Sequence, residues 1–449
     1  MTSLPASLVP RTRSVLREGV ARGTAGTLAL NLSATGLNFL VTLALTNALG
    51  ASGYGAYAFA FAWSTVLTVP AVLGLSPLIV RNVAQYHVEG RWGLLRGILR
   101  HSHLAILGTS LLVAGVAAGV GVAALGSRTH LLYPFLIGLL LVPLLSLTTM
   151  RQAAMQGLGK VVIGRLPETI VAPAGFLALV VAGWVALGDD FSASLALAFQ
   201  AGASAIAFVL GLWLLRRAVP RQARSTEPRY ETRDWVGSAV PLVASSLFTA
   251  LGAQLATILL GILDRSSEAG IYNAASRAAL FVSFLFLAAS YAVNPAIARL
   301  QAQGRHGELQ QLLSRSVRLL SLASAPVAIA FFVFAPQVLA IFGGGFEGGV
   351  AVLRILVIGE MVRVVTGFAW SALIMAKRER DVTLVAGVTL GLNGVLSAIL
   401  IPSLGAPGAA IATAISLVIT QLWLVGMAWT RLSLATALGQ SGRTRSVSP

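Results

Sequence analysis

The chain has 449 residues, of which 56% are hydrophobic and only 10% are charged, whereas about a quarter of the residues in a soluble domain carry a charge. With a mean hydropathy of +0.83, this composition excludes a water-soluble globule. The absence of cysteine also excludes disulfides, thiolate metal sites and cysteine nucleophiles.

Continuous apolar runs predict about twelve membrane-spanning helices, because a helix needs about 20 mainly apolar residues to cross the hydrocarbon core. The runs do not alternate as barrel strands do, so the predicted fold class is an all-α polytopic membrane protein. Arginines precede the first run, as in a signal peptide, but its length predicts an uncleaved helix. The expected spans are 27–49, 55–79, 103–125, 131–150, 167–187, 191–215, 236–262, 270–293, 319–342, 349–374, 382–401 and 408–428.

The positions of the basic residues agree with this topology. With both termini cytoplasmic, every Lys and Arg outside the spans falls in a cytoplasmic segment, apart from Arg128 and Arg265. The net charge of +17 is therefore an orientation signal, expected of a multi-pass protein of the inner (cytoplasmic) membrane. It does not form the single basic face that binds nucleic acid.

The longest polar run between the termini, Arg216 to Arg233, separates two hydrophobic halves of similar length. It is rich in arginine and has too little apolar surface to fold alone, so it is predicted to be a solvated linker. The predicted organisation is a cytoplasmic N-terminal segment, a six-helix N-lobe, a basic cytoplasmic linker, a six-helix C-lobe and a cytoplasmic tail, at residues 1–26, 27–215, 216–235, 236–428 and 429–449.

The two halves share a weak internal repeat. A Gly-x-Tyr motif follows the first span, at Gly55, and the seventh span, at Gly270. A Pro-x-x-x-Arg motif lies at nearly the same later offset in both halves, at residues 77–81 and 295–299. Each half has an even number of spans, so the two repeats have the same orientation, as in transporters whose substrate site lies between the lobes.

Charged residues inside spans are expensive and usually face a wet interior. Arg277 lies in the eighth span, and Arg354, Glu360 and Arg363 lie in the tenth. One interpretation is a Glu360–Arg363 ion pair, three residues apart on one helix face, with the other arginines reaching an interface. The alternative is a cationic substrate-binding cavity, because arginine binds phosphate or carboxylate oxygens bidentately.

Uncharged polar residues and one carboxyl group are further candidates. Asn31 and Asn38 lie on one face of the first span, with Thr35 and Thr42, and Asn273 lies one turn before Arg277. Such polar stripes either hydrogen-bond neighbouring helices or contact substrate. Glu168, between two prolines of the fifth span, is a candidate proton-coupling group or a solvated residue. Prolines inside spans predict kinked helices at Pro70, Pro143, Pro173, Pro241 and Pro326.

Residues 26–48, the run LGASGYGAY at 49–57 and the run GLSPLIVR at 74–81 resemble the polysaccharide flippases of the multidrug/oligosaccharidyl-lipid/polysaccharide (MOP) exporter superfamily, the O-antigen or Wzx-type translocases. The resemblance implies a V-shaped pair of six-helix lobes with alternating access. It implies a polyprenyl-diphosphate-linked oligosaccharide, moved from the inner to the outer leaflet for surface polysaccharide biosynthesis. It also implies basic residues in the central cavity, a role for Arg277, Arg354 and Arg363, although the N-lobe has no charge at matching depth.

A flippase makes and breaks no covalent bond, so neither an enzymatic activity nor a cofactor or metal is expected. The expected partners are the lipid-linked oligosaccharide, membrane lipids and enzymes of polysaccharide assembly, with no nucleic acid. Three alternatives remain open. They are a multidrug exporter of the same superfamily, a lipid II flippase, which usually has two further spans, and a membrane-bound glycan polymerase or ligase, which usually has a large outer loop.

Overall fold

The computed structural model describes residues 9–230 and 240–438, and within these ranges all regular structure is helical. The first half contains α1 (Val9–Val72), α2 (Ser76–Val88), α3 (Trp92–Leu125), α4 (Thr129–Gly138), α5 (Leu141–Gly157), α6 (Val161–Leu166), a π-helical turn (Pro167–Val171), α7 (Ala172–Leu187), α8 (Ala193–Ala218) and α9 (Arg221–Ser225). The second half contains α11 (Val240–Ile262), α12 (Ser266–Ala302), α13 (His306–Val333), α14 (Ala335–Ala340), α15 (Val350–Thr366), α16 (Ala369–Met375), α17 (Glu379–Leu404) and α18 (Ala406–Leu432).

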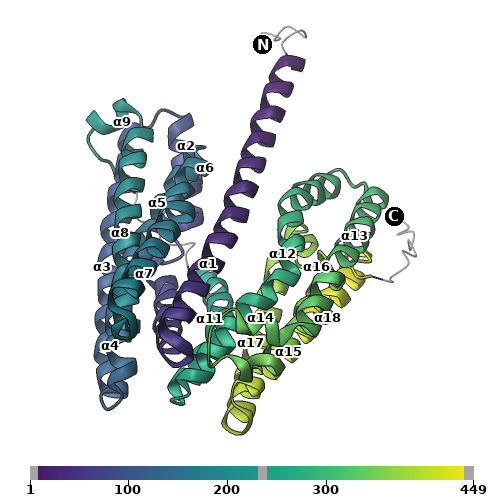
Figure 1. Cartoon of the computed structure of the whole chain (residues 1–449). Coiled ribbons are helices and arrows are strands. Elements are labelled where there is room, and N and C mark those ends of the chain that lie inside the picture. Colours follow the sequence, from purple (N-terminus) through teal and green to yellow (C-terminus); the bar gives the residue numbers. More distant parts are fainter. Residues whose placement is uncertain (1–8, 231–239, 439–449) are drawn as a thin grey trace.

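The described helices account for the twelve predicted spans. Nine stretches are long and apolar enough to cross a membrane by length and composition. One of them, Ala29–Val72, contains both of the first two predicted spans. The two remaining predicted spans correspond to α11 and to α15 followed by α16. The predicted all-α polytopic fold with two helical lobes is therefore confirmed, and Figure 1 shows α2 to α9 in one bundle and α11 to α18 in the other.

Several boundaries differ from the prediction. The first helix begins at Val9, well before residue 27, and no loop separates the first two spans. The chain instead reverses at Gly50, whose φ of 63° lies in the left-handed region that a residue with a side chain rarely adopts. The second predicted span is interrupted at residues 73–75, where Pro77 opens α2, and the tenth is interrupted after Thr366.

The internal repeat is visible in the packing of the motif tyrosines. The Tyr57 hydroxyl donates to Gln200 Oε1 of α8 at 2.9 Å, and the Tyr272 hydroxyl lies 3.0 Å from Thr413 Oγ1 of α18. Each motif tyrosine thus reaches the last spanning helix of its own lobe. The Pro-x-x-x-Arg motifs behave differently, because Pro77 begins a new helix whereas Pro295 lies within the continuous α12.

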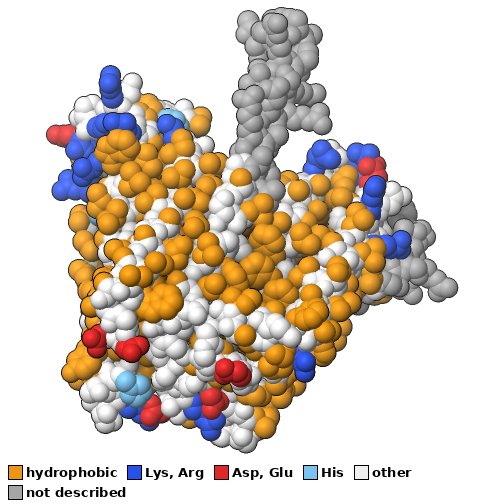
Figure 2. All heavy atoms as spheres, in the orientation of Figure 1, with side chains coloured by type: hydrophobic (Ala, Val, Ile, Leu, Met, Phe, Trp, Pro, Cys, Tyr) orange, Lys and Arg blue, Asp and Glu red, His pale blue; other side chains and the backbone are white. Residues whose placement is uncertain are grey.

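Charge divides the molecule into two ends. In Figure 2, blue side chains gather at the upper ends of both bundles, most of the red ones lie at the lower end, and a broad hydrophobic band separates them. We call these the arginine-rich end and the acidic end. Arg128 and Arg265, the two basic residues of the predicted outer loops, have structural partners at the acidic end. Arg128 donates to the Ile262 carbonyl oxygen at 2.7 Å, and its Nε lies 3.9 Å from Asp264 Oδ2. Because Arg128 belongs to the N-lobe and its two partners to the C-lobe, these contacts bridge the lobes.

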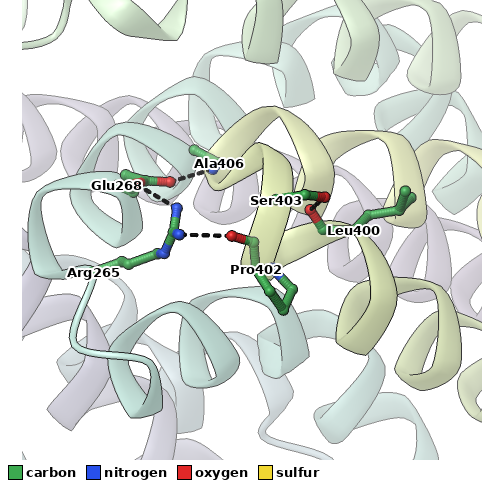
Figure 3. A network of polar contacts seen from close by, with 6 residues as sticks. All are labelled: Arg265, Glu268, Leu400, Pro402, Ser403 and Ala406. Atoms are coloured by element: carbon green, nitrogen blue, oxygen red, sulfur yellow. Dashed lines mark hydrogen bonds and ion pairs between the residues drawn. The ribbon is translucent and has the colours of Figure 1, made fainter.

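Arg265 has an equally definite structural role (Figure 3). Its Nη1 lies 2.9 Å from Glu268 Oε1, and its Nη2 donates to the Pro402 carbonyl oxygen at 2.8 Å. Glu268 Oε2 in turn accepts from the backbone N–H of Ala406 at 2.6 Å, at the N-terminus of α18. A carboxylate is favourable there because the helix N-terminus carries a partial positive charge. The pair therefore fastens α12 to the turn between α17 and α18.

The predicted solvated linker is partly ordered. Arg216 and Arg217 belong to α8, and α9 follows directly. The next residues lie across α3, where the Arg229 N–H donates to the Gly93 carbonyl oxygen at 2.9 Å. The first part of the basic run therefore packs on the N-lobe, while residues 231–239 lie outside the described part of the chain.

The lobes meet where α1 crosses α12 near the acidic end. A Cβ atom on Gly55 would lie 1.7 Å from the Ser266 carbonyl oxygen, and one on Gly270 would lie 2.1 Å from the Ala51 carbonyl oxygen. The two repeat-motif glycines thus allow backbone to meet backbone. Nearby, Asn47 Nδ2 donates to the Ile341 carbonyl oxygen at 3.1 Å.

A methyl group at Gly55 is expected to force the two lobes apart at the acidic end, because the backbone atoms it would meet have no freedom to move aside. We expect Gly55→Ala to slow disulfide formation between Asn47→Cys and Ile341→Cys by about tenfold. This factor corresponds to a loss of about 1.4 kcal/mol in the free energy that holds the lobes together at the acidic end. The absence of native cysteine makes the measurement specific.

Gly36→Ala supplies the control for this prediction. It adds the same methyl to the same helix, where no heavy atom lies within 4 Å of the new Cβ. Equal disulfide rates in the two variants would contradict the assigned role of the Gly55–Gly270 contact.

Candidate functional site

A polar network occupies the crossing of α1 and α12. The Tyr54 hydroxyl donates to Asn273 Oδ1 at 2.8 Å, and Arg277 Nε donates to the same oxygen at 3.1 Å. Asn273 Nδ2 lies 3.4 Å from Thr257 Oγ1 of α11. Asn273 and Arg277 are one helical turn apart, so α12 presents both toward α1. We call Tyr54, Tyr57, Gln200, Asn273 and Arg277 the apex cluster, because both lobes contribute to it.

The N-lobe supplies the neutral half of the apex cluster. Tyr54 and Tyr57 are buried and stack with ring centroids 6.0 Å apart, and Tyr57 donates to Gln200. Sequence reasoning found no charge at this depth of the N-lobe and did not select these three residues. The Gly-x-Tyr repeat was the available signal, since it contains Tyr57.

Arg277 is the cation of the apex cluster, and no carboxylate neutralises it within the described residues. It donates a hydrogen bond to the neutral amide of Asn273, and its side chain is half-buried. A cation removed from water without a counter-charge is costly, so the position favours an anion as its partner. The geometry can therefore bind a phosphate or carboxylate group between the lobes.

Arg363 lies in a different place, within the C-lobe. Its Nη2 is 3.3 Å from Glu360 Oε1, which is the ion pair that one interpretation of the sequence proposed. Both residues line an open cavity of about 480 Å³ between the C-lobe helices, together with Tyr272, Ser276 and Asn393. Glu360 Oε2 is buried and has no hydrogen-bond partner among the described residues, so the pair is incompletely satisfied.

Arg354 is separate from both groups. Its Nε donates to the Phe332 carbonyl oxygen at 3.0 Å, and its guanidinium lies 5.3 Å from the centre of the Phe332 ring. These contacts occupy it at the end of α13. The structure therefore does not bring Arg277, Arg354 and Arg363 into one cationic cavity, because they face different helices.

The polar stripe on the first span is satisfied largely within its own helix. Thr35 Oγ1 donates to the Asn31 carbonyl oxygen, Thr42 Oγ1 to the Asn38 carbonyl oxygen, and Asn38 Nδ2 to the Ala34 carbonyl oxygen. Asn31 Nδ2 is buried without a partner, whereas the Asn38 side chain is exposed. Thr42 lies within hydrogen-bonding reach of Tyr54 and so joins the stripe to the apex cluster. Asn31 and Asn38 remain candidates for binding a polar glycan.

Glu168 is held in an ion pair inside the N-lobe. It lies on the π-helical turn before α7, and its Oε2 accepts from Arg151 Nη2 of α5 and from Gln152 Nε2 at 3.3 Å. Arg151 is 1% exposed and Glu168 is 18% exposed. The predicted span 131–150 ends just before Arg151, whereas α5 continues to Gly157 and buries Arg151 within the N-lobe. Among the described residues no group of three or more His, Asp or Glu side chains is arranged to hold a metal ion.

The sequence matches known families. Residues 20–301 match the polysaccharide biosynthesis protein family, and residues 241–399 match the MatE family. The first match covers more than half of the chain, so the chain belongs to the polysaccharide biosynthesis protein family.

Two curated proteins of Haloferax volcanii are similar over part of the chain. A probable low-salt glycan biosynthesis flippase, Agl15, is 27% identical over 184 residues, which is 40% of this chain and 38% of the relative. A probable flippase, AglR, is 27% identical over 177 residues, which is 38% of this chain and 37% of the relative. The chain thus matches less than two fifths of the length of each relative.

Solved structures share the fold over nearly the whole chain. An inward-facing multidrug resistance MATE family transporter of the MOP superfamily superposes with a TM-score of 0.68 at 14% identity, covering 90% of this chain and 98% of that one. The lipid II flippase MurJ, in an inward closed conformation, gives a TM-score of 0.69 at 14% identity, covering 89% and 86%. The chain therefore shares its fold with transporters of the MOP superfamily.

Removing one partner of the buried Arg151–Glu168 pair is expected to destabilise the N-lobe. Glu168→Leu leaves a buried guanidinium without its counter-charge, which costs about 3–5 kcal/mol. We expect a clear fall in the midpoint of thermal unfolding in detergent. The double variant Arg151→Met/Glu168→Leu, which removes both charges, is expected to recover most of the loss.

A different result would assign Glu168 another role. If Glu168→Leu kept the wild-type unfolding midpoint but abolished transport, a structural ion pair would be contradicted and a coupling role for this carboxyl group supported.

Proposed function

We propose that this protein carries a polyprenyl-diphosphate-linked oligosaccharide from the inner to the outer leaflet of the cytoplasmic membrane, for surface polysaccharide biosynthesis, by alternating access of its two lobes. Membership of the polysaccharide biosynthesis protein family supports a lipid-linked glycan as substrate. The names of the two Haloferax volcanii relatives, both probable flippases, support movement between leaflets. Transport of this kind needs no bond-making residue.

The observation that carries the proposal is the unpaired charge of Arg277 at the junction of the lobes. A diphosphate leaving water needs a cation and hydrogen-bond donors in return. Arg277 supplies the charge, while the neighbouring hydroxyl and amide groups of Tyr54, Tyr57 and Gln200 are uncharged, so the site has a net positive charge. The glycan then contacts polar groups such as Asn31 and Asn38, and the polyprenyl chain remains in the lipid.

The arrangement of the lobes is that of a loading state. The lobes contact each other close to the acidic end, at Asn47, Gly55 and Arg128, whereas the bundles diverge toward the arginine-rich end in Figure 1. By the positive-inside rule we place the arginine-rich end, with both termini, in the cytoplasm. The proposed cytoplasmic segments are residues 1–26, 216–235 and 429–449, flanking the two proposed lobes. Substrate then enters from the inner leaflet.

A second candidate function is the export of an organic cation. The MatE match over residues 241–399 and the partnerless buried Glu360 Oε2 in the C-lobe cavity favour it. Arg363, however, already provides positive charge beside Glu360 at 3.3 Å, and Arg277 adds more charge of the same sign at the apex. The lipid-linked anion is therefore the better electrostatic match.

The experiment uses proteoliposomes that contain a fluorescent polyprenyl-diphosphate oligosaccharide. The readout is the fraction of this lipid that a membrane-impermeant enzyme can no longer reach. We expect Arg277→Gln to slow this movement by about 10- to 100-fold, since a hydrogen bond to a charged group contributes about 1.5–3 kcal/mol. Arg277→Lys is expected to be intermediate, because lysine keeps the charge but lacks the bidentate fork.

Arg299→Gln is the matched control, since Arg299 is exposed at the far end of the same helix, α12. It should transport at close to the wild-type rate. Wild-type speed in Arg277→Gln would contradict the assigned role of Arg277. Efflux of a cationic dye without movement of the lipid-linked glycan would favour the second candidate function.

A further inference from the structure

The N-lobe contains a second basic site that the transport proposal does not use. A cavity of about 610 Å³ lies at the arginine-rich end between α3 and α8, with α5 as its floor and α9 at its cytoplasmic side. Five arginines and one histidine line it, together with apolar residues, and no carboxylate does. The basic lining residues are Arg96, Arg100, His103, Arg151, Arg216 and Arg224.

Arg100 and Arg216 are ready to bind a ligand, whereas Arg96 and Arg224 already hydrogen-bond within the chain. Arg96 Nη1 donates to the Thr226 carbonyl oxygen at 2.8 Å, and Arg224 donates from Nε and Nη2 to the Val219 carbonyl oxygen. Arg100 and Arg216 are exposed, and no hydrogen bond or ion pair joins either of them to the described residues. Like charges gathered around one cavity repel each other, so an anion bound there would be stabilised by all of them.

The floor of the cavity is a buried guanidinium that is only partly satisfied. Arg151 uses Nη2 for Glu168, but its Nε and Nη1 are buried and have no partner among the described residues. Gly211 of α8 makes room for the group, since a Cβ there would lie 2.4 Å from Arg151 Cζ. These two donors are buried against α8, so Arg151 puts an incompletely neutralised positive charge beneath the cavity, which favours an anion there.

The surroundings of the cavity are those of the membrane interface. Leu104 lines it from α3 and is 58% exposed, so the hydrophobic surface of the bundle continues from the arginines toward the membrane interior. In Figure 2, blue side chains cover this end of the N-lobe directly above orange ones. A basic rim above an apolar surface, between spanning helices, matches a phosphate headgroup and its acyl chains together.

We propose that this cavity binds the phosphate headgroup of an anionic membrane phospholipid. Arg100 and Arg216 contact the phosphate oxygens from the two walls, and the acyl chains lie along Leu104 and the neighbouring apolar surface. The positive charge of Arg151 attracts the phosphate from beneath the floor. Bound in this way, the lipid joins α3, α5 and α8 at the end where the N-lobe is most crowded with positive charge. The proposal depends on the N-lobe alone and does not need the proposed transport activity.

The test is native mass spectrometry of the full-length protein in neutral detergent, titrated with phosphatidylglycerol and, separately, with phosphatidylcholine. The pocket variant is Arg100→Gln/Arg216→Gln. The matched control is Arg217→Gln/Arg221→Gln, which removes the same charge from exposed neighbours that do not line the cavity. We expect the pocket variant to bind the first phosphatidylglycerol at least about tenfold more weakly, and the control to stay within about twofold of wild type.

Several outcomes would overturn the proposal. Equal losses in the pocket variant and the control would show diffuse attraction to the basic end, and equal binding of phosphatidylcholine would exclude recognition of an anionic headgroup. Full displacement of the lipid by millimolar inorganic phosphate would identify a simple phosphate site. A tenfold loss of polyprenyl diphosphate binding, with phosphatidylglycerol unaffected, would assign the cavity to the transported lipid. None of these readouts requires transport, so they are separable from a failure of the proposed function.

Discussion

The close approach of α1 and α12 at Gly55 and Gly270 is the constraint on which the arrangement of the two lobes depends. Backbone meets backbone there, and any side chain at either position would collide with a carbonyl group. The contact brings Tyr54 of one lobe within hydrogen-bonding distance of Asn273 of the other, and Asn273 orients Arg277. A packing requirement and a candidate binding site are thus consequences of the same helix crossing.

The two lobes share a plan but divide the polar roles unequally. The Gly-x-Tyr motif gives each lobe a tyrosine that reaches its own last spanning helix, at Gln200 and at Thr413. The charge at the apex comes from the C-lobe alone, in Arg277, whereas the N-lobe keeps its buried arginine, Arg151, away from the apex and paired with Glu168. Because of this difference, the N-lobe sequence has no charge at the depth of Arg277.

The number of spans and the repeat could be predicted from the sequence, because the length of an apolar run that spans a membrane depends only on the bilayer. Contacts between distant segments could not. Nothing local in the sequence pairs Tyr57 with Gln200. Arg277, Arg354 and Arg363, which the sequence places inside spans, face different helices once the helices pack. Arg151 seemed to begin a loop, yet α5 continues past it. The reversal at Gly50 occurs within what appeared to be an ordinary apolar boundary.

The central claim is that the lobes open and close about this crossing in response to an anionic lipid bound at Arg277. It is tested most directly by pulsed electron spin distance measurements between labels on cysteines introduced into the otherwise cysteine-free chain. One label pair joins the lobes at the acidic end and another at the arginine-rich end. Polyprenyl-diphosphate oligosaccharide should lengthen the first distance and shorten the second in wild type, with no change in Arg277→Gln. Distances that stay fixed, or that change together in the same direction, would contradict alternating access about this crossing.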